Sequence, residues 1–216
     1  MLQHASAKSV SRILLSVITW FALVLQFTLM LKQGTQLAPS RLMLITNFFS
    51  YFTILSNILV AACLTFPWLM TSSAIARFFS RILVQAAVAV YIFIVGLVYN
   101  LVLRNIWNPT GWQLVADNLL HVVVPVGYVV YWFLFTPHRQ LEWKNIFPWL
   151  LFPGLYLVYS LMRGAVTGWY PYPFLNADQF GYSKVAFNAA MVLIAFIVTG
   201  LGVIAIDRNA GSGRKS

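Results

Sequence analysis

The chain has 216 residues, of which 61% are hydrophobic and only 8% are charged, and its mean hydropathy is +0.81. Because roughly a quarter of the residues in a soluble domain are charged, this composition excludes a water-soluble globular protein. The net charge of +10 does not indicate a nucleic-acid partner, since the basic residues lie in short connecting segments and form no continuous stripe.

Long apolar runs dominate the chain. A run of about 18 or more residues is long enough to cross a membrane as a helix, and six are found, at 13–31, 43–66, 82–103, 114–135, 146–165 and 185–206. We therefore expect residues 1–216 to form one integral membrane domain, an all-α bundle of six transmembrane helices. The first run is longer than the apolar region of a signal peptide, about 7–15 residues, so we expect it to be retained as the first span.

The basic residues predict how the spans are oriented. Nine of the 14 Lys and Arg residues lie on the side that holds both termini and the second and fourth connections, against five on the other side. The positive-inside rule then predicts that both termini are cytoplasmic. The aromatic segments NIWNPTGW (105–112) and GWYPYPFL (168–175) would lie at the outer interface.

Polar residues recur along the second span. Thr46, Ser50, Thr53 and Asn57 follow at spacings of 4, 3 and 4, which predicts one polar face on one helix. A polar group in lipid needs a partner or a cavity. Such residues also join helices by hydrogen bonds, and that structural role stays open for Ser50, Thr53 and Asn57.

The fourth span carries an ionisable group at depth. His121 lies nine residues after Trp112, about 13 Å deep at about 1.5 Å per residue. Pro125 removes the helical hydrogen bond to the carbonyl of His121 and predicts a kink there. Asp117, one turn earlier, is placed to orient the imidazole. We therefore expect His121 to be a functional base rather than a packing residue.

Neither a metal ion nor a cofactor is expected beside this histidine. His4 lies in the N-terminal tail and His138 in a cytoplasmic connection, so neither is expected to reach His121. Cys63, in the middle of the second span, is the single cysteine of the chain, so an intramolecular disulfide is also excluded.

A hydroxyl becomes a nucleophile when a base lies beside it, and the second span supplies the candidates. Thr53 lies ten residues after Met43, about 15 Å deep by the same rise, which matches the depth of His121. Ser50, a turn shallower, is the second candidate. Asn57, Asn118 and Arg163 are candidate donors for an oxyanion or a substrate carboxylate, although Arg163 also fits a snorkelling side chain at a span end.

Three segments together resemble one family of membrane proteins. They are NFFSYFTILSN (47–57), DNLLHVVVP (117–125) and VTGWYPYPFLN (166–176). In this order within six spans, they resemble the androgen-induced protein family of six-transmembrane threonine hydrolases and its bacterial relatives. The spacing from Asn118 to His121 is three here, whereas the family has four, and TILSN lacks an acid found in the family.

The resemblance implies a function for the same two residues. Family members hydrolyse fatty acid esters of hydroxy fatty acids with an intramembrane threonine nucleophile and a histidine base, which correspond here to Thr53 and His121. It implies a lipid or fatty-acyl ester as substrate and a bacterial cytoplasmic membrane as location. The alternatives are a small transporter or lipid-binding protein with a polar path through Asp117, His121 and Arg163, and a scaffold without site chemistry.

Overall fold

The structure is a computed structural model that describes residues 2–34 and 40–210, with side chains described for 6–32 and 40–210. Within these ranges the chain is helical and contains no strand, which confirms the all-α prediction. Six helices are long and apolar enough to cross a membrane, in the predicted order: Ser6–Lys32, Phe52–Leu69, Ile82–Leu103, Gly111–Phe135, Trp143–Thr167 and Ala177–Asn209.

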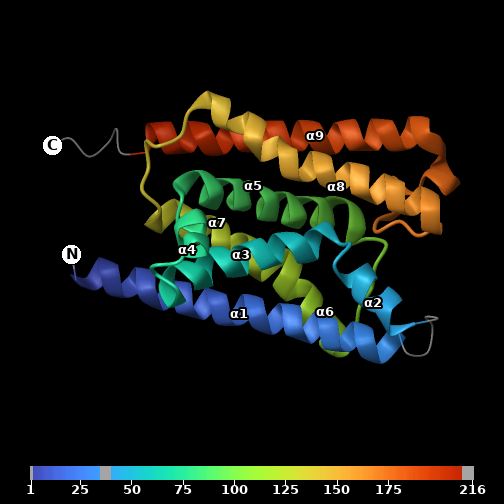
Figure 1. Cartoon of the computed structure of the whole chain (residues 1–216), viewed down its shortest axis with the longest axis horizontal. Helices are drawn as coiled ribbons and strands as arrows, with labels where there is room; N and C mark the ends of the chain where they lie inside the picture. Colours follow the sequence, from blue (N-terminus) through green and yellow to red (C-terminus); the bar gives the residue numbers. More distant parts are fainter. Residues whose placement is uncertain (1, 35–39, 211–216) are drawn as a thin grey trace. The chain divides into compact units, whose positions relative to one another are not determined.

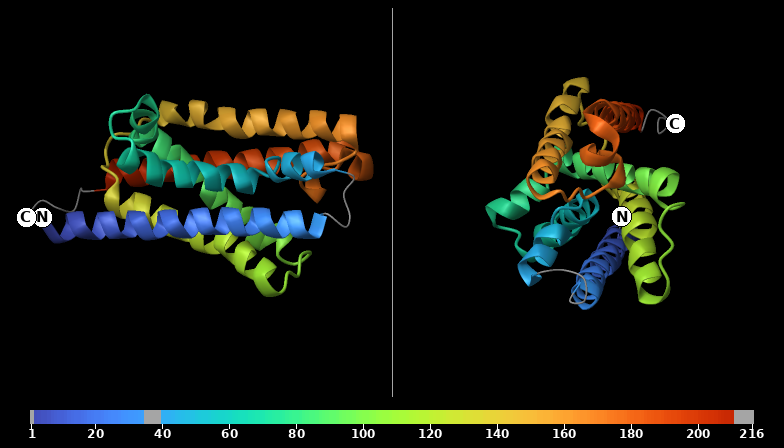
Figure 2. Two further views of the ribbon diagram at one scale, coloured as in Figure 1. Left: turned by 60° about the horizontal axis from the view of Figure 1, so that its bottom comes forward. Right: turned by 90° about the vertical axis from the view of Figure 1, so that its right-hand side faces the viewer.

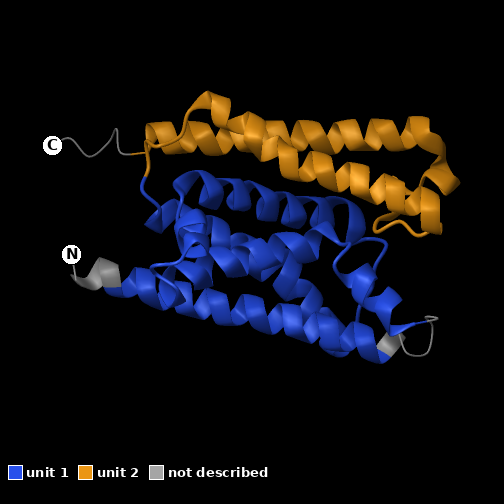
Figure 3. Ribbon diagram, in the orientation of Figure 1, with its two compact units in different colours: residues 1–137 blue, residues 138–216 orange. Residues whose placement is uncertain are grey.

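The chain divides into two compact units, Met1–Pro137 and His138–Ser216 (Figure 3). The first unit holds four of the long helices and the second unit holds two. That the two units pack into one six-helix domain stays a prediction.

The first unit is built around four packed spans (Figure 1). Helix α3 packs between α1 and α5, and α7 packs against both α5 and α1, so that each long helix has two long neighbours. Figure 2 shows α1 and α3 running side by side. The elements of this unit are α1 (Leu2–Gly34), α2 (Arg41–Phe48), α3 (Phe52–Leu69), α4 (Ala74–Phe79), α5 (Ile82–Val98), the π-helical turn η1 (Tyr99–Leu103), α6 (Gly111–Asn118), the π-helical turn η2 (Leu119–Val123) and α7 (Val124–Phe135).

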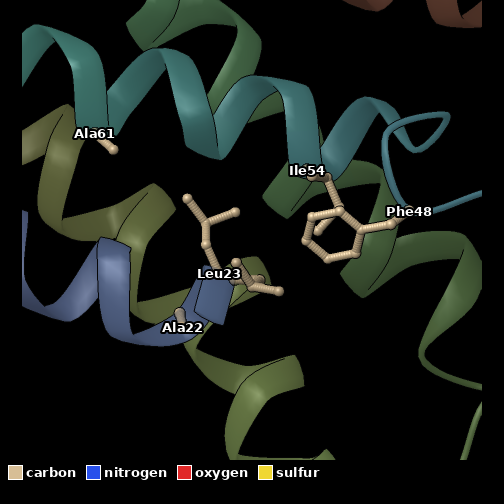
Figure 4. Close-up of a cluster of buried hydrophobic side chains, with 6 residues drawn as sticks. Ala22, Leu23, Phe48, Ile54 and Ala61 are labelled. Atoms are coloured by element: carbon tan, nitrogen blue, oxygen red, sulfur yellow. The ribbon is translucent and has the colours of Figure 1, made fainter. Parts of the chain in front are cut away.

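A buried apolar cluster ties α1, α2, α3 and η2 together (Figure 4). Small residues on α1 and α3 let these helices approach, and an aromatic ring from α2 closes one end. Two members of this cluster are sequence neighbours of the predicted site residues: Ile54 follows Thr53, and Leu120 precedes His121. Its buried members are Ala22, Leu23, Phe48, Ile54, Ala61 and Leu120.

The second unit is a helical pair, in which α8 (Ile146–Thr167) packs against α9 (Ala177–Asn209), with the short 3-10 turns η3 (Trp143–Asn145) and η4 (Pro173–Leu175) at their ends. Gly168 caps the end of α8, and its φ of 67° is the left-handed conformation that glycine adopts easily. The buried carboxylate of Asp207 accepts the backbone N–H groups of Gln140 and Leu141 at 3.0 and 2.9 Å, and so fixes the entry to this unit.

The second predicted span is not one continuous helix, and the prediction of 43–66 is wrong in this respect. Helix α2 ends at Phe48, and α3 starts afresh at Phe52. The hydroxyl of Ser50 donates to the carbonyl of Thr46 at 2.6 Å, and the N–H of Ser50 bonds the carbonyl of Asn47 at 3.0 Å. These local bonds compete with helix continuation.

This break changes the placement of Thr53. The residue lies in the first turn of α3 rather than ten residues into a single helix, so the depth estimate from Met43 does not hold. Thr46 lies in α2 and Ser50 lies in the break, whereas Thr53 and Asn57 follow it within α3. The predicted single polar face is therefore shared between two helices and the turn that joins them.

The fourth span departs from regular helix at the predicted position, although in a different form. Instead of a simple proline kink, residues Leu119–Val123 form a π-helical turn in which the N–H of Val124 bonds the carbonyl of Leu119. Because Pro125 has no N–H, the regular bond to the carbonyl of His121 cannot form. The wider turn rotates the residues of η2 relative to α6 and places His121 toward α3 and η1.

Candidate functional site

The two residues predicted to act together lie in contact. The Oγ1 atom of Thr53, from the start of α3, lies 3.4 Å from the Nε2 atom of His121 in η2. Nucleophile and base are often this far apart in hydrolase sites without substrate, and they close on binding. The sequence separation of 68 residues means that the fold, and not local geometry, brings the hydroxyl and the imidazole together.

The other ring nitrogen of His121 faces only acceptors. Its Nδ1 atom lies 2.9 Å from the backbone carbonyl oxygen of Asp117 and 3.3 Å from the carboxylate atom Oδ1 of the same residue. A neutral imidazole with two acceptors at Nδ1 carries its hydrogen there. The lone pair of Nε2 is then directed to the hydroxyl of Thr53, as a general base requires.

Tyr99 completes this arrangement from the neighbouring helix. Its ring stacks on the imidazole of His121, with ring centroids 4.0 Å apart and planes inclined by 14°. Its hydroxyl donates a hydrogen bond to the Oδ2 atom of Asp117. The carboxylate of Asp117 thus faces two groups, Tyr99 through one oxygen and His121 through the other.

Both aromatic partners are carried by π-helical turns. Tyr99 opens η1, where the N–H of Arg104 bonds its carbonyl at 2.8 Å, and His121 lies inside η2. Such turns are rare in proteins, and those that occur are often found at functional sites. The extra residue turns side chains away from the regular helical face.

A close approach of α5 to the proline break supports these turns. A Cβ atom placed on Gly96 would lie 3.2 Å from the carbonyl oxygen of His121 and 3.2 Å from the Cβ atom of Pro125. Only glycine leaves room for this approach without a shift of the neighbours. The backbone at His121 is therefore held in place by packing against α5.

Asn57 connects the backbones that carry the two site residues. Its amide nitrogen donates to the carbonyl of Thr53 at 2.8 Å and to the carbonyl of Leu120 at 3.3 Å. Both amide hydrogens are therefore directed at carbonyls, and the side chain is fully buried. This geometry assigns Asn57 to positioning α3 against η2 rather than to donating a bond to an oxyanion.

The remaining predicted site residues lie elsewhere or are engaged differently. Ser50 directs its hydroxyl hydrogen to the carbonyl of Thr46 at 2.6 Å, away from a role as nucleophile. Asn118 donates to the carbonyl of Leu114 at 2.9 Å, within its own helix. Arg163 belongs to the second unit, where its guanidinium lies 4.5 Å from the ring of Trp169 and donates to the hydroxyl of Tyr159 at 3.3 Å.

The site is almost closed to solvent. Thr53 is 7% exposed, and the side chains of His121 and Asp117 are 14% and 6% exposed. In this setting a hydrogen bond or ion pair is stronger than in water. Among the described residues, no three His, Cys, Asp or Glu side chains gather as a metal site would require.

Comparison of the chain with models of known protein families, with curated proteins and with solved structures finds no match. A function for the chain is therefore inferred from its residues and their geometry.

Two residues of the cluster were not predicted as site residues. Tyr99 is one of several aromatic residues near span ends, where interfacial anchoring is the usual role, and no spacing rule joins it to Asp117. Gly96 lies in the third apolar run, and nothing in the sequence indicates that it faces Pro125. Both become visible only when α5 and η1 are packed against α6 and η2.

Proposed function

We propose that the chain is an intramembrane hydrolase of lipid esters, with Thr53 as nucleophile and His121 as general base. The observation that carries the proposal is the direction of the His121 ring. Its Nδ1 atom faces the backbone carbonyl oxygen of Asp117 at 2.9 Å and the Oδ1 atom of the same residue at 3.3 Å. Its Nε2 atom faces the hydroxyl of Thr53 at 3.4 Å. This is the order of groups found in hydrolases that use a hydroxyl nucleophile.

The chemistry follows from this order. The Thr53 oxygen attacks the ester carbonyl carbon while its hydrogen passes to Nε2 of His121. Collapse of the tetrahedral intermediate breaks the bond to the leaving alcohol, which takes the proton from Nε2. Water, deprotonated by the same nitrogen, then releases the acid and restores Thr53. Asp117 stabilises the imidazolium that exists between these proton transfers.

A lipid is the substrate class that fits the surroundings. Thr53 and His121 lie on helices apolar enough to cross a membrane, next to a cluster of buried apolar side chains. An ester carried by long acyl chains reaches such a site laterally from the bilayer. The resemblance of segments 47–57, 117–125 and 166–176 to the androgen-induced protein family favours fatty acid esters of hydroxy fatty acids.

The proposal is tested with the purified full chain in detergent micelles, with a p-nitrophenyl ester of a medium-chain fatty acid and a fluorophosphonate probe. Thr53→Ala and His121→Ala should abolish turnover and labelling, whereas Thr53→Ser, which keeps a hydroxyl, should retain both. Ser50→Ala removes the second candidate nucleophile but keeps the N–H of residue 50 and its bond to the carbonyl of Asn47, so it should still be labelled. Labelling that persists in Thr53→Ala but is lost in Ser50→Ala would reject Thr53 as the nucleophile.

The same groups suggest one alternative function. Tyr99, Asp117 and His121 form a line of proton-exchanging side chains, as found along the paths of membrane transporters. A transporter would show proton-coupled uptake in liposomes and no ester turnover in detergent. Turnover that is lost in His121→Ala would favour the hydrolase over this alternative.

A further inference from the structure

We propose that Tyr99 is the positioning residue of this site, which locks both Asp117 and the ring of His121 in the arrangement that makes Nε2 a base. The inference rests on the proposed function for its catalytic consequence. The control of the His121 tautomer by Tyr99 does not depend on that function and has a measurement of its own.

Tyr99 makes one contact with each member of the pair. Its ring covers one face of the imidazole at a centroid distance of 4.0 Å with planes 14° apart, and its hydroxyl donates to Oδ2 of Asp117. The residue is 4% exposed. A residue that served only as packing would explain the stack but not the bond to the carboxylate.

The stack restricts the rotation of the imidazole. Rotation of the ring about its χ2 torsion by half a turn would exchange the positions of its nitrogens and carbons, and so remove the basic nitrogen from Thr53. A flat ring held parallel at 4.0 Å blocks the intermediate orientations, because aromatic faces leave no space for an inclined neighbour at this separation.

The hydroxyl controls the carboxylate. A buried carboxylate needs donors for both of its oxygens. Tyr99 supplies one for Oδ2, which leaves Oδ1 directed to Nδ1 of His121 at 3.3 Å. Without the hydroxyl, Oδ2 would lack this donor, and the carboxylate would turn to recover one. The hydrogen on Nδ1 would then lose one of its two acceptors.

The two contacts are separated by two substitutions. Tyr99→Phe keeps the ring and removes the hydroxyl, whereas Tyr99→Leu removes both contacts. Tyr131→Phe is the matched control, because it removes a tyrosine hydroxyl that accepts a hydrogen bond from Arg12 at 3.2 Å, with no part in the site. Each variant is purified as the full chain and assayed with the p-nitrophenyl ester.

Tyr99→Phe should lower kcat by about tenfold to a hundredfold, the usual effect of one lost hydrogen bond to a charged group, with KM unchanged because the proposed role of Tyr99 is to position Asp117 and His121. Tyr99→Leu should lower kcat further, and Tyr131→Phe should leave it unchanged. A kcat for Tyr99→Phe equal to that of the wild type, while His121→Ala is inactive, would overturn the inference and leave the proposed hydrolase intact.

The second measurement does not depend on activity. Nitrogen-15 NMR of histidine-labelled protein, with His121→Ala used to assign the signal, should show the hydrogen on Nδ1 in the wild type and in Tyr131→Phe. Tyr99→Phe should show exchange between both tautomers. If Thr53→Ala retains turnover, the hydrolase proposal fails and this spectrum alone decides on Tyr99. An unchanged spectrum in Tyr99→Phe would overturn the inference.

Discussion

His121 has two ring nitrogens in different surroundings, and this difference places the ring hydrogen on Nδ1 and the lone pair on Nε2. Asp117 contributes twice at Nδ1, through its backbone carbonyl at 2.9 Å and its carboxylate at 3.3 Å. The backbone contact follows from helical spacing alone, whereas the carboxylate contact also needs Tyr99. The tautomer of the base is thus held by one local and one tertiary interaction.

This double support predicts the effect of Asp117→Asn. The backbone carbonyl stays in place, so the ring should keep its tautomer in part. We expect kcat to fall by about tenfold to a hundredfold, less than the roughly 10⁴-fold loss that follows removal of the orienting carboxylate in a Ser-His-Asp hydrolase. Ester turnover measured beside His121→Ala checks the prediction. Equal inactivity of the two variants would contradict the prediction that the backbone carbonyl preserves part of the activity.

The residues of the site differ in how far the sequence predicts them. Thr53 and His121 were singled out as polar groups in apolar spans, and the structure brings them together. Asp117 was placed beside His121 by a spacing of four, which any helix preserves. Tyr99 was missed, because its relation to Asp117 depends on two π-helical turns and on the packing of neighbouring helices, neither of which leaves a periodic signal.

At the scale of elements, the six spans were predicted in order because long apolar runs are the strongest signal that a sequence carries. The interruption of the second span was missed, because the segment from Phe48 to Phe52 contains neither proline nor glycine. The break depends on the hydroxyl and amide of Ser50, which bond back to Thr46 and Asn47. The fourth span was predicted to kink at His121, because Pro125 cannot donate to its carbonyl, and the structure instead has a wider π-helical turn over Leu119–Val123.

The approach of α5 to this turn predicts the effect of Gly96→Ala. The new Cβ atom would lie 3.2 Å from both the carbonyl oxygen of His121 and the Cβ atom of Pro125, and neither a backbone atom nor a proline ring yields easily. Overpacking costs about 1–3 kcal/mol, against a gain in helix propensity of about 1 kcal/mol. We expect a net loss of about 1 kcal/mol in the free energy of unfolding and lower ester turnover.

Gly154→Ala on α8 is the control for this prediction, because nothing lies within 4 Å of a Cβ atom there. Heat-induced loss of helical circular dichroism in detergent should show the control at or above wild-type stability and Gly96→Ala below it. Equal stability of Gly96→Ala and wild type would show that α5 and the turn at His121 separate without cost, which would contradict the close packing.

In the molecule as a whole, one contact shows which ends of the first and fourth spans lie together. The ammonium of Lys8, near the start of α1, donates to the carbonyl of Phe135 at the end of α7, at 2.8 Å. The start of the first span and the end of the fourth therefore lie at the same end of the first unit. This is the arrangement that four successive crossings of a membrane produce.

The orientation of the chain is predicted from this threading and from the charges. Two further crossings by α8 and α9 would return the C-terminus to the side of the N-terminus, which carries nine of the 14 Lys and Arg residues. The positive-inside rule makes that side cytoplasmic. Fluorescent-protein fusions at the C-terminus should therefore fluoresce, whereas alkaline phosphatase fused there should be inactive and phosphatase fused after residue 108 should be active. The reverse pattern would place both termini outside. Substitution of Arg77 and Arg81 by Gln should shift the fusion activities toward that reverse pattern, because these residues supply two of the nine charges that hold the predicted orientation.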